Sequence, residues 1–451
     1  MPQYPDGTRI HEAEWGRLLQ AIPSSYTIWK DGTTIRAESN ISGGTDYSGT
    51  VASTVIQNAI DALTDGGVIF VRTGIYELTS ALTINTDGIS IVGEGSGRNQ
   101  VYFLFPPSPL ARLTKGTVFK VTVANTNAIS ITGRRFGINL AHFGIDFTQV
   151  NTGHGISCTA AVGNIGLSEF EFDDIFVNDH GIDKYALYME SPCQGSVTHL
   201  HSYGGGLLDM VSTDTLAAGA QFYCGNIQFN DMYAWITKAM TQPPFYMRRT
   251  SATGILGLCQ FNRLQMNCVF DLGVVYAMEM LYTQFSSFIS LDIECTTNNG
   301  IAMGSCKDIT FIEPMMNQPD YWSVAADCEN IRVFGGFINS IVDDKDATDT
   351  YTGTWMLDVA ALNVAKLIDC KVTAANLLTN NRGKATILNG TATIAVTHGL
   401  RTTPTYITLT GTHEEVHEAY ATTIGAASFT ITVDGNVTAN RDVYWYASCD
   451  Q

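Results

Sequence analysis

One short pattern recurs through the middle of the chain and limits what the chain can fold into. It is an apolar residue flanked mainly by polar ones, and it returns about every 27 residues, at intervals of 20 to 32. The residues that mark it are Ile145, Ile175, Leu200, Met232, Leu264, Leu291, Phe311 and Val333. Helical periodicity is absent from the same stretch, so the repeat predicts stacked coils whose strands lie parallel at ~4.8 Å. The unequal intervals indicate loops of different length between the strands.

Composition narrows the classes of partner. The 451 residues carry 43 acidic and 25 basic side chains, a formal charge of −18, which disfavours binding to nucleic acid or to an anionic membrane surface. With 45% hydrophobic residues the chain can bury a large core, which excludes intrinsic disorder. Apolar runs stay well short of the ~20 residues of a membrane span, and the opening MPQYPDGTRI has no signal-peptide pattern. We therefore expect no membrane span and no signal peptide.

The cysteines give no evidence of a metal or redox site. The ten are scattered without a C-x-x-C pair, mostly among apolar residues of expected strands. We interpret them as small buried hydrophobic residues.

Three regions follow from the patterns along the chain. Residues 1–50 are expected to form a helix over residues 10–22 followed by a hairpin that turns at Asp31-Gly32. Residues 51–380 begin with a second helix, whose apolar face is predicted to consist of Val55, Ile56, Ala59, Ile60 and Leu63, and continue as the repeat. Residues 385–451 alternate apolar and polar residues as an antiparallel β-sandwich does.

Two segments resemble known protein families. The segment from Ile56 to Gly97, a helix followed by short β-branched runs and glycine turns, resembles the N-terminal entry of the pectate-lyase-like superfamily of right-handed parallel β-helices. The phrase HGL-x-x-T-P followed by VYWYA resembles small β-sandwich modules at the ends of phage tail proteins. The expected fold is all-β: a right-handed parallel β-helix with an N-terminal helix and hairpin cap and a C-terminal antiparallel β-sandwich.

These resemblances also imply a function. They indicate a tailspike-like polysaccharide depolymerase, a homotrimer on a virion surface or outside the cell, with a polysaccharide as its substrate. No cofactor is implied unless the protein is a lyase, for which Ca²⁺ is the expected ion. Exposed β-branched residues of the sandwich, Ile407, Ile424 and Val443, are expected to help assemble the trimer.

Residues beside each repeated apolar position should point outward, so that stacking gathers them into columns. The column one residue before contains Gly144 in the first rung and then the candidate catalytic residues Asp174, His199, Asp231 and Arg263. The columns after it supply the candidate substrate-binding residues His201, Tyr203, Tyr233 and Trp235. Arg248 and Arg249 are expected to hold an acidic substrate nearby. Aromatic rings beside polar groups are suited to binding a sugar.

Several interpretations of these columns remain open. Asp174 and Asp231, two rungs or ~9.6 Å apart, suit an inverting hydrolase. In a lyase, Arg263 would neutralise a uronate carboxylate while His199 or Tyr203 removes the adjacent proton. A non-enzymatic glycan-binding spike would use the same aromatic residues without turnover. The structural alternative is that outward polar ladders of a β-helix only satisfy one another.

Other motifs are weaker candidates. Asp292 and Glu294 share one strand face and form a second candidate catalytic pair. Glu169, Glu171 and Asp173 suggest a solvated edge or a cation site.

Two metal or hydrolase motifs are not adopted. The sequence HEEVH at 413–417 matches a zinc motif but lies between expected strands and lacks a third ligand, so no metal site is predicted. Fragments at 85–87 and 153–155 are similar to polygalacturonase motifs, but the aspartate pair that should separate them is missing, which leaves His154 a minor candidate.

Overall fold

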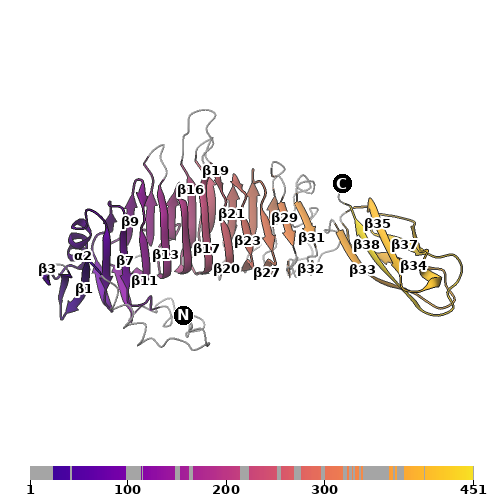
Figure 1. The fold of residues 1–451 in the computed structure, drawn as a ribbon, viewed down its shortest axis with the longest axis horizontal. Coiled ribbons are helices and arrows are strands. Elements are labelled where there is room, and N and C mark those ends of the chain that lie inside the picture. The colour runs from indigo at the N-terminus through magenta and orange to yellow at the C-terminus, as the bar shows by residue number, and fades with distance from the viewer. Residues whose placement is uncertain are drawn as a thin grey trace.

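The computed structural model describes residues 24–40, 43–97, 113, 115–147, 153–161, 166–213, 223–250, 255–268, 276–295, 300–317, 322–324, 328, 331–334, 337–338, 365–368, 371–372, 380–400 and 402–449. They form a rod of stacked parallel strands with a β-sandwich at its C-terminal end (Figure 1). The right-handed parallel β-helix predicted from the sequence is confirmed. The predicted helix over residues 10–22 lies outside the described residues.

A long bent sheet makes up most of the rod in the part of the chain that the structure describes. Its 23 strands are β1 (Tyr26–Asp31), β2 (Thr34–Ser39), β3 (Gly44–Gly49), β4 (Gly67–Val71), β5 (Gly74–Leu78), β7 (Ile89–Gly93), β8 (Thr117–Val121), β10 (Arg135–Phe136), β11 (Asn139–Phe147), β13 (Leu167–Asn178), β15 (Cys193–Gly204), β17 (Tyr223–Ile236), β19 (Ile255–Gly257), β20 (Gln260–Cys268), β22 (Thr283–Gln284), β23 (Ser287–Ile289), β24 (Asp292–Cys295), β26 (Thr310–Ile312), β27 (Met315–Asn317), β29 (Ile331–Phe334), β30 (Phe337–Ile338), β31 (Ala365–Ile368) and β32 (Lys371–Val372).

A second sheet closes the coil on the other side. Over the same described residues its nine strands are β6 (Leu82–Ile84), β9 (Ile129–Thr132), β12 (Ile156–Thr159), β14 (Tyr185–Glu190), β16 (Gly206–Ser212), β18 (Phe245–Arg249), β21 (Met278–Leu281), β25 (Ile301–Gly304) and β28 (Trp322–Val324). All its pairings are parallel, because each strand stacks on the equivalent strand one coil earlier.

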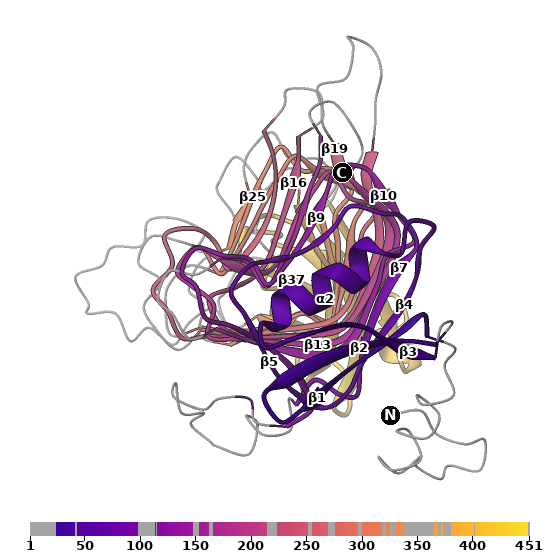
Figure 2. The same ribbon diagram turned by 90° about the vertical axis from the view of Figure 1, so that its left-hand side faces the viewer.

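The N-terminal end of the coil is covered by a short helix and a hairpin. Helix α2 (Ala52–Asp61) lies across the open end (Figure 2), and its predicted apolar face is buried. Burying that face keeps water from the first rung. Strands β1 and β2 pair antiparallel, and the turn falls at Gly32-Thr33, one residue later than predicted, with Gly32 at a φ of +62°.

The repeated apolar residues all point into the coil, where each is no more than 2% exposed. Their alignment differs from the prediction at both ends. Ile175 lies opposite Phe143, not Ile145, and Phe311 lies opposite Phe288, not Leu291. The first slip is by two residues, which keeps the side chain inward. Phe229, Phe261 and Phe288 form part of an inward stack, with successive ring centroids 4.4 and 4.6 Å apart.

The C-terminal module is an antiparallel β-sandwich, as predicted. One sheet consists of β33 (Asn380–Ile387), β38 (Arg441–Ser448) and β35 (Tyr406–Gly411), and the other of β34 (Thr393–Thr397), β37 (Ser428–Thr432) and β36 (Tyr420–Thr422); the short helix η3 (Glu414–Val416) lies between β35 and β36. The expected exposure of Val443 and Ile407 is wrong. Val443 is fully buried and Ile407 packs against the same core, because alternation along their strands turns both inward. The homotrimer stays a prediction.

The described part of the chain contains no helix long and apolar enough to cross a membrane.

Candidate functional site

Five side chains on successive rungs form a column at a bend of the long sheet. We call His142, Asp174, His199, Asp231 and Arg263 the corner column. Each has a positive φ, between 48° and 60°, where the strand turns from one face of the coil to the next. Asp and His tolerate this left-handed conformation better than most residues do, which partly explains their presence. Arginine has no such preference, so the backbone alone does not account for Arg263.

The bend also places two consecutive residues on the outside of the coil. Phe172 and Ile175 both point inward, while Asp173 and Asp174 between them are partly exposed. Ordinary strand alternation would turn one of the two aspartates inward. Asp173 therefore lies on the outside beside the corner column and contacts His199, whereas Glu169 and Glu171, which were expected to share its face, are exposed.

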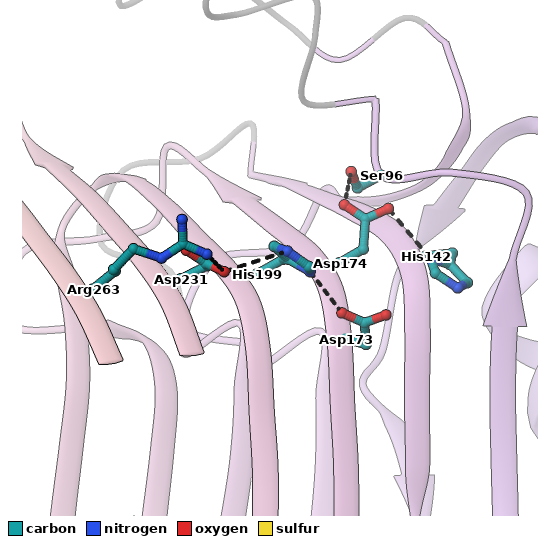
Figure 3. A network of polar contacts seen from close by, with 7 residues as sticks. All are labelled: Ser96, His142, Asp173, Asp174, His199, Asp231 and Arg263. Carbon is teal, nitrogen blue, oxygen red and sulfur yellow. Dashed lines mark hydrogen bonds and ion pairs between the residues drawn. The ribbon is translucent and has the colours of Figure 1, made fainter. Parts of the chain in front are cut away.

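A chain of polar contacts runs along four rungs, from β13 to β20 (Figure 3). Nδ1 of His199 is 3.0 Å from Oδ1 of Asp173, and Nε2 faces Oδ2 of Asp231 at 3.7 Å. Arg263 donates a hydrogen bond to the same Oδ2. Because the carboxylate of Asp173 accepts from Nδ1–H, the neutral imidazole has its lone pair on Nε2.

A second group lies beside this chain. Asp174 accepts a hydrogen bond from the Ser96 hydroxyl at 2.9 Å and lies 3.3 Å from Nδ1 of His142. Burial disfavours the charged form of His142, but the hydrogen bond to Asp174 and the negative charges of Asp174 and Asp173 outweigh it, so the pKa of His142 is raised. This half of the column therefore favours a positively charged imidazole.

Arg263 is the most exposed side chain of the corner column. The side chains of Asp231 and His199 are 27% and 36% exposed, and that of Arg263 is 72% exposed. The guanidinium can therefore meet a ligand while it still contacts Asp231.

Two predicted substrate-binding residues lie next to the column. The rings of His201 and Tyr233 are half-buried, with centroids 5.8 Å apart, and Asn267 donates to the Tyr233 hydroxyl at 3.2 Å. Burial raises the pKa of Tyr233 to about 12. Tyr233 is therefore a neutral ring and hydroxyl that can contact a sugar.

The prediction that Tyr203 lines an open surface is wrong. It is 5% exposed and packs with Phe176 and Leu113, and Trp235 is partly buried against the same cluster. Leu113 and Val118, both distant from Tyr203 in the sequence, belong to this cluster. Tyr203 has its pKa raised by burial and cannot reach a substrate proton.

Arg248 and Arg249 do not lie beside Arg263, contrary to the prediction. They belong to β18 in the second sheet. Arg248 makes a bidentate contact with Asp209, at 3.2 and 2.9 Å, and lies over the Tyr246 ring. Arg249 stacks on Tyr282. Arg248 and Arg249 are close to Arg263 in the sequence, but they belong to the second sheet and Arg263 belongs to the long sheet.

The pair Asp292 and Glu294 shares a face of β24, as expected, but it is not part of the network in Figure 3. In the register of the parallel strands, Asp292 lies opposite Gln265, and Gln265 lies opposite Tyr233. Burial, and then the charge of Glu294, raise the pKa of Asp292. The pair stays a candidate acid and base on the same outer face.

The minor candidates are engaged in structural contacts. His154 stacks on Tyr185 and Tyr188, and burial lowers its pKa to about 3. Glu415, within the HEEVH motif, accepts hydrogen bonds from Thr438 and Arg441. Across the described residues, no cluster of three or more His, Cys, Asp or Glu side chains is arranged to hold a metal ion.

Sequence reasoning missed three members of the site: Ser96, His142 and Asp173. A signal for His142 existed, since an ionisable residue directly before an inward apolar one is common to His142-Phe143, Asp174-Ile175 and His199-Leu200. Ser96 gave no signal, because it reaches Asp174 across 78 residues.

Comparisons with known proteins give architectural similarity only. No protein-family model and no curated protein matches the sequence. Among solved structures, ORF18 of Geobacillus virus E2 is 13% identical, over 91% of this chain and 84% of that one, with a TM-score of 0.38. The A-module of mannuronan C-5 epimerase AlgE4 from Azotobacter vinelandii is 12% identical, over 71% and 91%, with a TM-score of 0.34. Tailspike protein gp49 from Pseudomonas phage LKA1 is 11% identical, over 85% and 67%, with a TM-score of 0.31. Because these identities and TM-scores are low, the parallel β-helix is assigned from the strand pairings of this chain and not from these structures.

Proposed function

We propose that this protein cleaves an extended acidic polysaccharide by β-elimination at the corner column, with His199 as the base. The observation that carries the proposal is the position of His199, between the carboxylates of Asp173 and Asp231, with the exposed guanidinium of Arg263 one rung further on. A base, a group that orients it and a cation for the substrate carboxylate are thus adjacent.

Each residue has a definite part in the reaction. Arg263 pairs with the uronate carboxylate and stabilises the charge that develops on it when the neighbouring C5–H is broken. The proton passes to Nε2 of His199, while Asp173 holds the ring in the required tautomer. The C4–O4 bond breaks as the C4=C5 double bond forms, and the leaving oxygen takes the proton back from the imidazolium. Asp231 stabilises that imidazolium during the step.

The geometry supports hydrolysis less well. An inverting hydrolase needs one carboxyl group as acid and another as base across the substrate. Oδ2 of Asp231 already faces Arg263 and His199, and both oxygens of Asp174 contact Ser96 or His142. These contacts occupy Oδ2 of Asp231 and both oxygens of Asp174, which leaves the two carboxyl groups less available as an acid and a base than the imidazole of His199.

An acidic substrate is consistent with the exposed positive charge of Arg263. The whole chain repels anions at −18, so an acidic glycan requires a local cation, and Arg263 is the exposed one in this network. We further propose, as the resemblance to tailspikes implies, that the protein works outside the cell or on a virion surface. A requirement for Ca²⁺ stays a prediction. Measuring turnover with and without a chelator tests it.

A polysaccharide screen tests the proposal. Polygalacturonate, alginate and hyaluronate, with dextran as a neutral control, are incubated with the full chain and assayed for ultraviolet-absorbing unsaturated ends and for reducing ends. We expect both products from at least one acidic glycan and neither from dextran. Reducing ends without unsaturation would replace the lyase by a hydrolase, and binding without either product would show a glycan-binding spike.

A further inference from the structure

The C-terminal β-sandwich exposes aromatic residues on one face. Along β38, Val443, Trp445 and Ala447 point into the core while Tyr444 and Tyr446 point outward. Tyr444 is 53% and Tyr446 40% exposed, and Tyr406 on the neighbouring β35 is 59% exposed. The centroids of the Tyr406 and Tyr446 rings are 6.4 Å apart. Three exposed rings on one sheet are more than the scattered exposed apolar residues of an ordinary surface.

Polar side chains flank these rings on both sides. In the register of the sheet, Arg382 lies opposite Tyr446 and Lys384 opposite Tyr444, both on β33. Thr408 and Thr410 on β35 lie opposite the same two tyrosines. All four residues are exposed. The central strand thus presents rings, one edge presents cations, and the other presents hydroxyl groups.

We propose that this tyrosine face, formed by Tyr406, Tyr444 and Tyr446 with Arg382 and Lys384, is a binding site for an acidic polysaccharide. Tyrosine rings offer an apolar plate for the C–H face of a sugar, and their hydroxyls and the threonines can hydrogen-bond its hydroxyl groups. The two cations complement a uronate carboxylate on a protein whose net charge is −18.

The composition of the face favours a glycan over a protein partner. Tyr and Arg are common at protein interfaces as well, but Lys and Thr are under-represented there, and two cations beside hydroxyl groups complement the carboxylates and hydroxyls of an acidic glycan. Lys384 is also 3.1 Å from Asp442, which in turn accepts from Thr386, so the centre of the sheet is bordered by a polar network. This site does not depend on the corner column and would bind glycan even if the β-helix performs no reaction.

Affinity electrophoresis of the full chain in gels containing polygalacturonate, alginate or hyaluronate, with dextran gels as the neutral control, tests the site. We expect retardation by an acidic glycan, an about tenfold or greater loss of affinity in Tyr444→Ala/Tyr446→Ala, and a smaller loss in Arg382→Gln. The matched control is Tyr420→Ala, because Tyr420 is 47% exposed on the other sheet and should not matter. The Tyr444→Ala/Tyr446→Ala change should cause the same loss of affinity in the His199→Ala background, which separates this site from the proposed chemistry.

Three results would overturn the inference. One is unchanged affinity in the folded double tyrosine variant, and another is equal loss in Tyr420→Ala. The third is a change in oligomeric state of the double variant by light scattering, which would identify the face as a contact between copies of the chain. Circular dichroism confirms that each variant is folded before it is scored.

Discussion

Two aspartate–arginine pairs lie on the outside of the coil, and they differ chiefly in burial. In the second sheet, Asp209 is 4% exposed and Arg248 30% exposed, and the pair is bidentate. At the bend of the long sheet, Asp231 is 27% and Arg263 72% exposed. Burial raises the pKa of Asp209 even though Arg248 opposes the shift. The same two residue types therefore form a structural pair in one place and a pair open to a ligand in the other.

The difference shows why residue type alone does not identify a site. Arg248, Arg249 and Arg263 lie within 16 positions of one another, and this closeness in sequence suggests that all three bind an acidic substrate at one site. A coil of the β-helix turns the chain through separate faces, so neighbours in sequence are not neighbours in space. Exposure, and not charge, separates Arg263 from the other two.

Breaking the buried pair should have the largest effect. Arg248→Met removes the cation and leaves the Asp209 carboxyl group buried without its partner, which should lower the free energy of unfolding by about 3 kcal/mol. The matched variant Arg263→Met should cost less than about 1 kcal/mol, because that pair is exposed. Urea unfolding followed by circular dichroism measures both. Equal losses in the two variants would mean that burial does not distinguish the pairs.

A smaller effect should depend on pH. The pKa of His142 is raised above its ordinary value of 6.5, so its charged form stabilises the folded state. That contribution is fully present below pH 6.5 and is lost as the pH rises through the raised pKa. Asp174→Asn removes the partner carboxylate and should lower the Tm more at about pH 5 than at about pH 9, by the equivalent of less than about 1 kcal/mol.

The control for that experiment is Glu171→Gln, an exposed change on the same strand that should show no such pH dependence. A Tm loss in Asp174→Asn that grows with rising pH would contradict the sign assigned to His142.

Much of the architecture could be predicted from the sequence, because burial imposes a pattern on every rung. Ile175, Leu200, Met232 and Leu264 align as expected, and the predicted apolar face of α2 is buried. The alignment failed at Phe311 because two inward apolar residues three positions apart, such as Phe288 and Leu291, flank the bend of a rung, and the pattern does not show which of them Phe311 stacks on.

The candidate site was predictable only in part, for the same reason. His199, Asp231 and Arg263 follow from stacking, whereas Asp173 faces outward only because the bend interrupts strand alternation. Tyr203 is buried in a cluster that includes Leu113 and Val118, which are distant from it in the sequence. Contacts made across long sequence distances, such as Ser96 with Asp174, leave no local pattern.

The most direct test of the account is the turnover of His199→Ala on whichever acidic polysaccharide yields unsaturated ends. We expect the rate at saturating substrate to fall by about 10²-fold or more, with the unfolding midpoint nearly unchanged, because His199 lies outside the core. Asp231→Ala should behave similarly, while Asp292→Asn and Glu171→Gln should retain turnover within about twofold. Full activity in both His199→Ala and Asp231→Ala, with loss in Asp292→Asn, would contradict the assignment and move the chemistry to Asp292 and Glu294.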